Sequence, residues 1–202
     1  MFADVDVAAD AFAVIGEHAP QSFSDDVPGG ADAGRIYRNV VGFAVGVYPF
    51  SFAREWFALG RLATSPSIGF AHAYLCPPER LGPPVRVAET PDDDAPAPRH
   101  LLKGNELWSD AEQIWVECKV LPPPERWSAT FRKTVVTALA AEYALATASD
   151  RNTWAALRAA AYGTEADKFR GGYMGAAIAE DARATPPRRL PSSSPLIAAR
   201  FR

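Results

Sequence analysis

The distribution of proline constrains the fold of this 202-residue chain more than any other feature. Proline makes up about 9% of the residues, against an average near 5%, yet none lies between residues 125 and 185. A proline inside a helix costs about 3 kcal/mol and alanine is the best helix former, so this Ala-rich stretch is predicted to be helical. Seven prolines crowd between Pro77 and Pro98, where strands and loops are expected instead.

Apolar residues at helical spacing predict two helices within the proline-free stretch. The first begins after Ser128 as N-cap and the second after Asp150. The second carries its apolar face as far as Phe169, unless Gly163 or the pair at 171–172 interrupts it. The first should bury one face, formed by Trp127, Phe131, Val135, Leu139 and Tyr143.

Two further helices are predicted near the N-terminus. Residues 5–15 have helical spacing and stop at Gly16, a natural helix terminator. Residues 32–47 repeat the pattern and end before Pro49. Their apolar positions are Ile36, Val40, Phe43 and Val47.

Residues 50–121 mix aromatic and β-branched residues with Gly and Pro, which suits strands and loops. The clearest strand runs from Ile114 to Val120, because apolar and polar residues alternate along it. Residues 101–108 read as two strands around a turn at Gly104, so a small antiparallel sheet is expected. Residues 89–98 contain three aspartates and three prolines and should form an exposed loop.

These elements predict an α+β fold: a helical bundle with a small antiparallel β subdomain and an extended C-terminal arm. Residues 1–49 supply the N-terminal helices, and residues 50–121 form the β-rich subdomain with its Pro-rich loop. Residues 122–181 supply the long helices that complete the bundle. Residues 182–202 form the arm.

Charge and cysteine content exclude several classes of protein. The net charge of −3 and the pI near 5.6 argue against a chain that binds polyanions with its whole surface. Two cysteines, Cys76 and Cys118, are too few for a disulfide framework, and no apolar run approaches the ~20 residues of a membrane span. Acids stand where a secretory signal needs bases, so a soluble, reducing compartment without membrane contact is expected.

The sequence contains no nucleophile elbow, phosphate loop or dinucleotide-binding fingerprint. The spacing of His72 and Cys76 makes them candidate metal ligands. The residues between them are predicted to form a strand, however, which would hold the two side chains too far apart to bind one metal ion easily. The aspartates at 92–94 lack a partnering histidine or second acidic segment, so they are read as a solvated loop. We therefore expect no enzyme, no catalytic or metal-binding residues and no cofactor.

The last 21 residues contain five arginines, four prolines, three serines and no acid, together with several apolar residues. This composition favours an arm that orders on a partner over a frayed terminus. The arginines also leave open a small DNA-binding protein, in which Arg188, Arg189, Arg200 and Arg202 would neutralise phosphates.

The order of these pieces resembles the head-to-tail adaptor proteins of tailed bacteriophages, especially the tail tubular protein A family of short-tailed phages. The similar segments are residues 15–17 followed by Ser22, the aromatic stretch 48–53, residues 73–77 with Leu81, and the start of the long helix at Trp127. The chain also ends in a similar way, with a helix reaching residues 180–182 and a polar, basic extension. The Pro-rich insertion between residues 77 and 98 matches least, and Phe50 and Leu196 stand where tryptophan is common.

The resemblance implies a structural protein of the virion neck, assembled in the host cytoplasm as a homo-oligomeric, twelvefold ring. The ring would lie under the portal protein, connect the capsid to a tail or nozzle protein, and surround a channel through which DNA passes without specific binding. A tail-completion or neck protein without portal contact is the alternative within phage structure. The residues expected to bind the portal all lie in the arm: Arg188, Arg189, Leu190, Pro195, Leu196, Ile197, Arg200, Phe201 and Arg202.

Overall fold

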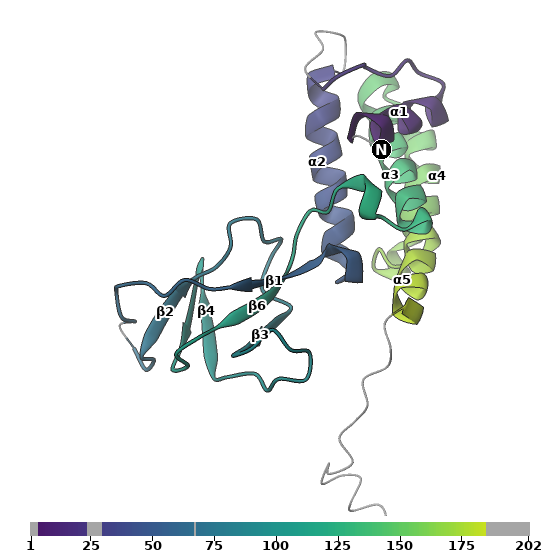
Figure 1. The fold of residues 1–202 in the computed structure, drawn as a ribbon. Helices are drawn as coiled ribbons and strands as arrows, with labels where there is room; N and C mark the ends of the chain where they lie inside the picture. The colour runs from purple at the N-terminus through teal and green to yellow at the C-terminus, as the bar shows by residue number, and fades with distance from the viewer. Residues whose placement is uncertain (1–3, 24–29, 67, 185–202) are drawn as a thin grey trace, which may run out of the picture.

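The computed structural model describes residues 4–23, 30–66 and 68–184, which form a helical bundle and a smaller β-rich part beside it (Figure 1). The β-rich part is inserted between the second and third helices in the sequence. The expected α+β fold is therefore confirmed. The arm residues from 185 onward lie outside the described residues.

The bundle is built around one central helix. Helix α3 (Ala129–Ala148) packs against each of the other four described helices. The predicted helices are all present. The four that surround α3 are α1 (Asp4–Ile15), α2 (Gly30–Val47), α4 (Arg151–Tyr162) and α5 (Gly172–Ala184).

Both predicted N-caps are confirmed. The Ser128 hydroxyl accepts a hydrogen bond from the backbone N–H of Phe131 at 3.3 Å, at the start of α3. The Asp150 carboxylate accepts from the backbone N–H groups of Asn152 and Thr153, both at 3.0 Å, at the start of α4. Each cap satisfies donors that the first turn of a helix leaves without an intrahelical partner.

Gly163 interrupts the helix that follows Asp150, which the sequence left open as the alternative to a helix reaching Phe169. Helix α4 ends at Tyr162, and Gly163 adopts φ +79°, a left-handed conformation that favours glycine. A side chain at Gly172 would collide with the Ala160 carbonyl, so glycine allows α5 to start close to α4. Helix α5 then continues to Ala184, past the expected start of the arm at residue 182.

The β-rich part contains two antiparallel sheets of three strands, where a single small sheet was expected. One sheet has the order β1 (Arg54–Ala58), β6 (Trp115–Lys119) and β3 (Arg86–Ala88). In this sheet β1 and β6 pair over their full length and connect the β-rich part to the bundle (Figure 1). The other has the order β2 (His72–Leu75), β5 (Glu106–Ser109) and β4 (His100–Lys103).

The strands of the β-rich part follow the predicted patterns, with one exception. The hairpin of β4 and β5 turns at Gly104, and residues 89–98 form the exposed loop that was expected. Along β6, Val116 and Cys118 are buried as predicted. Glu117 is also buried, and its carboxylate forms an ion pair with Arg54 of β1 at 3.2 Å that offsets the cost of burying the charge.

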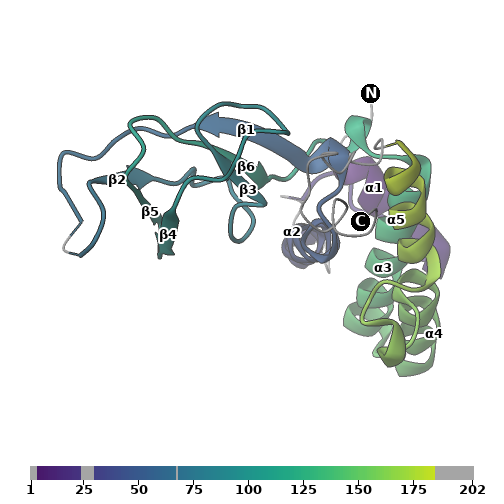
Figure 2. The ribbon, with the colours of Figure 1, turned by 90° about the horizontal axis from the view of Figure 1, so that it is seen from below.

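The two parts have separate cores that approach each other at a short aromatic junction. Phe50 and Phe52 lie just before β1 and contact Phe131 of α3, with ring centroids 4.8 and 5.0 Å away. Asp181 of α5 accepts hydrogen bonds from the Ser51 backbone N–H at 3.0 Å and from its hydroxyl at 2.6 Å. Seen from below, the β-rich part extends away from the bundle beyond this junction (Figure 2).

Candidate functional site

The arm residues assigned to portal binding, from Arg188 to Arg202, all lie outside the described residues. The structure describes the helix that precedes them. Helix α5 ends at Ala184, at the end of the bundle where the β-rich part is attached (Figure 1). The chain therefore leaves the described fold close to the junction of its two parts.

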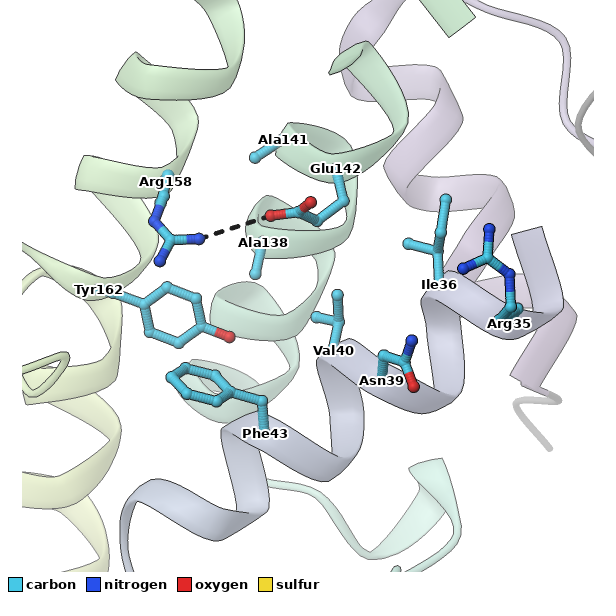
Figure 3. Close-up of a pocket in the computed structure, with 10 residues that line it drawn as sticks. All are labelled: Arg35, Ile36, Asn39, Val40, Phe43, Ala138, Ala141, Glu142, Arg158 and Tyr162. Carbon is cyan, nitrogen blue, oxygen red and sulfur yellow. Dashed lines mark ion pairs between the residues drawn. The ribbon is translucent and has the colours of Figure 1, made fainter. Parts of the chain in front are cut away.

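The bundle carries a groove of about 350 Å³ between α2 and α4. These helices flank α3, whose small side chains Ala138 and Ala141 form the floor (Figure 3). Helix α2 contributes apolar Ile36 and Val40 to one wall. Small floor residues allow a close approach by another segment, as at helix–helix contacts.

One polar atom in the groove has no hydrogen-bond partner. Tyr162 of α4 is 5% exposed, and its hydroxyl is buried without a partner among the described residues. The hydroxyl points toward the groove (Figure 3). Burial raises the pKa of the Tyr162 phenol, so the group remains a neutral donor at physiological pH. An unpaired buried hydroxyl is unfavourable by about 1–3 kcal/mol, which a bound acceptor would relieve.

Three charged side chains line the groove: Arg35, Glu142 and Arg158. Arg158 of α4 lies 3.6 Å from Glu142 of α3, a long ion pair drawn in Figure 3. Arg35 of α2 also lines the groove and pairs with Asp32 at 2.9 Å. Both guanidinium groups are thus already paired with carboxylates, and the phenol of Tyr162 is the donor that the groove leaves without a partner among the described residues.

Exposed aromatic side chains form one margin of the groove. Phe43 of α2 is 44% exposed and makes edge-to-face contacts with Tyr162 and Phe169, with ring centroids 5.4 and 5.3 Å away. Phe169 is also partly exposed, and the Arg158 guanidinium lies over its ring. A groove with an exposed aromatic rim is typical of a protein interaction surface.

The positions weighed for metal binding lie in the β-rich part. His72 is on β2 with Nε2 3.5 Å from Glu112, whereas Cys76 lies in the buried cluster that also contains Cys118. Among the described residues no group of three or more His, Cys, Asp or Glu could hold a metal ion. Asp92 and Asp93 lie in the exposed loop, where Asp93 pairs with Arg86 at 2.5 Å.

Both cysteine thiols are buried in the β-rich part. Burial raises the pKa of the Cys118 thiol to about 11 and also raises that of Cys76. The reactive thiolate is therefore scarce at neutral pH. Neither side chain is in the groove.

Comparison with known proteins adds no assignment: no protein-family model matches this chain, and no curated protein sequence is significantly similar to it. Across residues 4–23, 30–66 and 68–184, none of the helices has the length and apolar character needed to cross a bilayer.

The groove was not identified from the sequence. Phe43 was counted in the apolar stripe of its helix, and Phe169 was expected to extend the helix after Asp150. Their partial exposure results from how far α2 stands from α4, which residue spacing does not encode.

Proposed function

We propose that this protein is a structural head-tail adaptor of a tailed bacteriophage. It assembles as a ring under the portal, connects the capsid to the tail, and surrounds the channel through which DNA leaves. In this role the helices make the ring, the arm contacts the portal, and the β-rich part faces the tail.

The observation that carries the proposal is the division of the molecule into two bodies with separate cores. The bundle core and the β-rich core share none of their buried side chains, and β1 and β6 connect the two parts. A subunit of this shape presents one surface from its bundle and another from the β-rich part beside it (Figure 1). That arrangement suits a protein whose task is to join two unlike partners around a shared axis.

The position of the chain end supports a separate role for the arm. Helix α5 ends at Ala184, and its Asp181 bonds to Ser51 just before β1, so the described chain ends near the junction of the two parts. Burial of an apolar side chain such as Leu196, Ile197 or Phe201 on a partner contributes about 1.5–3 kcal/mol, before the ordering of the arm is subtracted. Repetition around a ring multiplies a modest gain in each subunit.

The first experiment mixes the purified chain with the assembled portal ring of the same phage. The mass of the complex is measured by light scattering, and a stoichiometric ring-on-ring mass is expected. If the assembled portal forms no complex with the full chain, the adaptor proposal fails and the neck protein without portal contact replaces it. A salt-dependent shift of duplex DNA by the chain would instead favour the DNA-binding alternative.

A second experiment tests the arm within the same assay. Deletion of residues 185–202 leaves α5 intact, so the circular dichroism spectrum should keep its helical signal. Portal binding should be lost in the deletion and strongly weakened in the triple variant Leu196→Ser, Ile197→Ser, Phe201→Ser. Substitution of Ser192, Ser193 and Ser194 by alanine is the matched control and should bind as the full chain does. Undiminished binding by the deletion would remove the arm from the proposal.

A further inference from the structure

We infer that the groove between α2 and α4 receives the apolar segment 196–199 from the arm of the same chain. Three features select this occupant: an unpaired phenol in the groove, the internal pairing of the charged groups that line it, and the place where α5 ends. The contact forms without the portal. It therefore goes beyond the proposed function and is tested separately from it.

The Tyr162 hydroxyl lacks an acceptor among the described residues. The side chain is 5% exposed, and its hydroxyl is buried and points toward the groove (Figure 3). A backbone carbonyl of an occupant accepts from this hydroxyl and removes the cost of an unpaired buried donor. A protein acceptor for it lies outside residues 4–23, 30–66 and 68–184.

The lining of the groove favours an uncharged occupant. Arg158 pairs with Glu142, and Arg35 pairs with Asp32, so each guanidinium already has a carboxylate. A further charged group would lose its hydration in the groove without gaining a free partner. Apart from the amide of Asn39 and the phenol, the other lining residues are apolar, so neutral apolar side chains match them best.

The size of the groove favours a short segment. Its volume of about 350 Å³ is near the lower end of the roughly 300–1,000 Å³ of ligand pockets, so a few side chains fill it. The floor of Ala138 and Ala141 lets such a segment approach α3 closely. Phe43 and Phe169 are 44% and 42% exposed at one margin, and covering them adds buried apolar area to the contact.

The arm contains a segment of this kind. Residues 190–199 carry no charge, although arginines precede and follow them. Leu196 and Ile197, followed by two alanines, supply the apolar side chains. Because these four side chains offer no acceptor, a backbone carbonyl of the segment is the acceptor for the Tyr162 hydroxyl.

The position of α5 brings the segment within reach of the groove in its own chain. Helix α5 starts beside Tyr162, whose carbonyl accepts from the Gly171 N–H at 3.0 Å. The 13 residues of α5 rise about 20 Å from there to Ala184. Extended residues 185–195 span up to about 36 Å, so they cover the return with length to spare.

The other two stretches near the bundle that lie outside the described residues fit the site less well. Residues 24–29 contain two aspartates and end at the start of α2, about 20 Å along this helix from Phe43. Six extended residues span only about 20 Å in total, too little to reach Phe43 and return. Residues 1–3 precede Asp4, which accepts from the Tyr37 hydroxyl at 2.8 Å, and Tyr37 does not line the groove.

Thiol cross-linking on the full chain tests the contact. The double variant Asn39→Cys, Ala198→Cys places one thiol in the groove and one in the arm, and the two native thiols are buried. In dilute solution a short bis-maleimide should join the two positions within one chain, which peptide mapping detects. Arg38→Cys with Ala198→Cys is the matched control, because position 38 is exposed on the same helix but does not line the groove. Its cross-linking should be at least about tenfold slower, and equal rates would overturn the inference.

A mixture of two single variants tests the rival occupant, the arm of another copy. If Asn39→Cys and Ala198→Cys on separate chains form dimers as fast as the double variant forms its internal link, the groove holds a neighbour's arm and the inference fails. Absence of a cross-link both in the double variant and in the mixture overturns it as well.

The Tyr162 hydroxyl gives a second readout that needs no added thiol. Tyr162→Phe removes a donor that is paired in the full chain and unpaired after deletion of residues 185–202. The substitution should therefore lower the thermal midpoint of the full chain but not that of the deletion. Tyr143→Phe is the matched control, because its hydroxyl bonds to the Ala33 carbonyl at 3.1 Å and its loss should lower both midpoints alike. The same shift in both proteins for Tyr162→Phe would overturn the inference.

The portal assay decides the proposed function separately. A complex with the portal but no cross-link leaves the proposed function standing alone. A cross-link without portal binding keeps the inference and removes the function.

Discussion

The bundle and the β-rich part reach their folded state by different means. In the bundle, four helices pack on α3 and share one large core that extends to the aromatic residues at the junction. In the β-rich part, seven buried side chains from both sheets form a small cluster: Tyr74, Cys76, Val87, Leu107, Ile114, Val116 and Cys118. Burial of apolar area is the main favourable term in folding, so most of the stability is expected to come from the bundle.

The difference shows that the two parts of one chain can contribute unequally to its stability. The bundle carries enough core to fold firmly, whereas the β-rich part depends on strand pairing and on the junction with the bundle. Local unfolding generally begins where few apolar contacts hold the chain. Substitutions in the two parts should therefore have different consequences.

The largest effect is expected at Phe131 in the bundle. Its ring is fully buried and contacts Phe50, Phe52 and Trp127, so it supports both the bundle and the junction. Phe131→Ala should lower the free energy of unfolding by about 3–5 kcal/mol, measured by urea denaturation with far-UV circular dichroism. Lys133→Ala, at an exposed position of the same helix, should change it by less than about 0.5 kcal/mol. A loss below about 1 kcal/mol at Phe131 would contradict the assignment of the junction to the main core.

A somewhat smaller and more local effect is expected at Leu107 in the β-rich part. The side chain is fully buried in the small cluster, and its truncation should destabilise this part by about 2–5 kcal/mol. In Leu107→Ala, hydrogen exchange should accelerate at the amides of β5 and β6, while those of α3 keep their protection. Leu101→Ala, at a half-exposed position of β4, is the control. Equal acceleration in α3 would show that the two parts unfold as a single unit.

The hydrogen bonds between Asp181 and Ser51 should give the next effect. Asp181→Ala removes the buried carboxylate that accepts hydrogen bonds from the Ser51 N–H and hydroxyl, and the loss of bonds to a charged acceptor is expected to lower the free energy of unfolding by about 1–3 kcal/mol. Asp181→Asn keeps an acceptor oxygen and should lose less. Denaturant midpoints compare the two variants with the native chain. If both variants unfold at the native midpoint, the link between α5 and the junction contributes nothing to stability.

The smallest effect is a dependence of bundle stability on pH. Hydrogen bonds from Thr153 lower the pKa of the Asp150 carboxyl, and hydrogen bonds from Thr164 lower that of Asp167. Because these folded pKa values lie below the unfolded value, the stabilisation is fully present above the unfolded pKa of about 3.9 and is lost as pH falls through the folded pKa. The thermal midpoint of the native chain should therefore fall between pH 5 and 3 by more than that of the double variant Asp150→Asn, Asp167→Asn. Parallel curves for the two proteins would contradict these pKa shifts.

The sequence by itself determined the helices and their caps. Helical spacing, the capping residues Ser128 and Asp150, and the proline-free stretch all act within a few residues of one another, so they can be read along the chain. Alternation along β6 and the turn at Gly104 were local in the same sense. The burial of Glu117 could not be read along the chain in this way, because it depends on an ion pair with Arg54, which lies on another strand.

Only the tertiary structure decided how the strands divide and where the groove lies. The pairing of residues 54–58 with residues 115–119 brings together segments separated by the entire β-rich part, and no local pattern encodes that choice. The groove likewise depends on the distance that α3 imposes between α2 and α4, which leaves Phe43 exposed and the Tyr162 hydroxyl without a partner among the described residues. Periodicity specifies which face of a helix is apolar, whereas the packing of whole helices decides which part of that face stays open to another molecule.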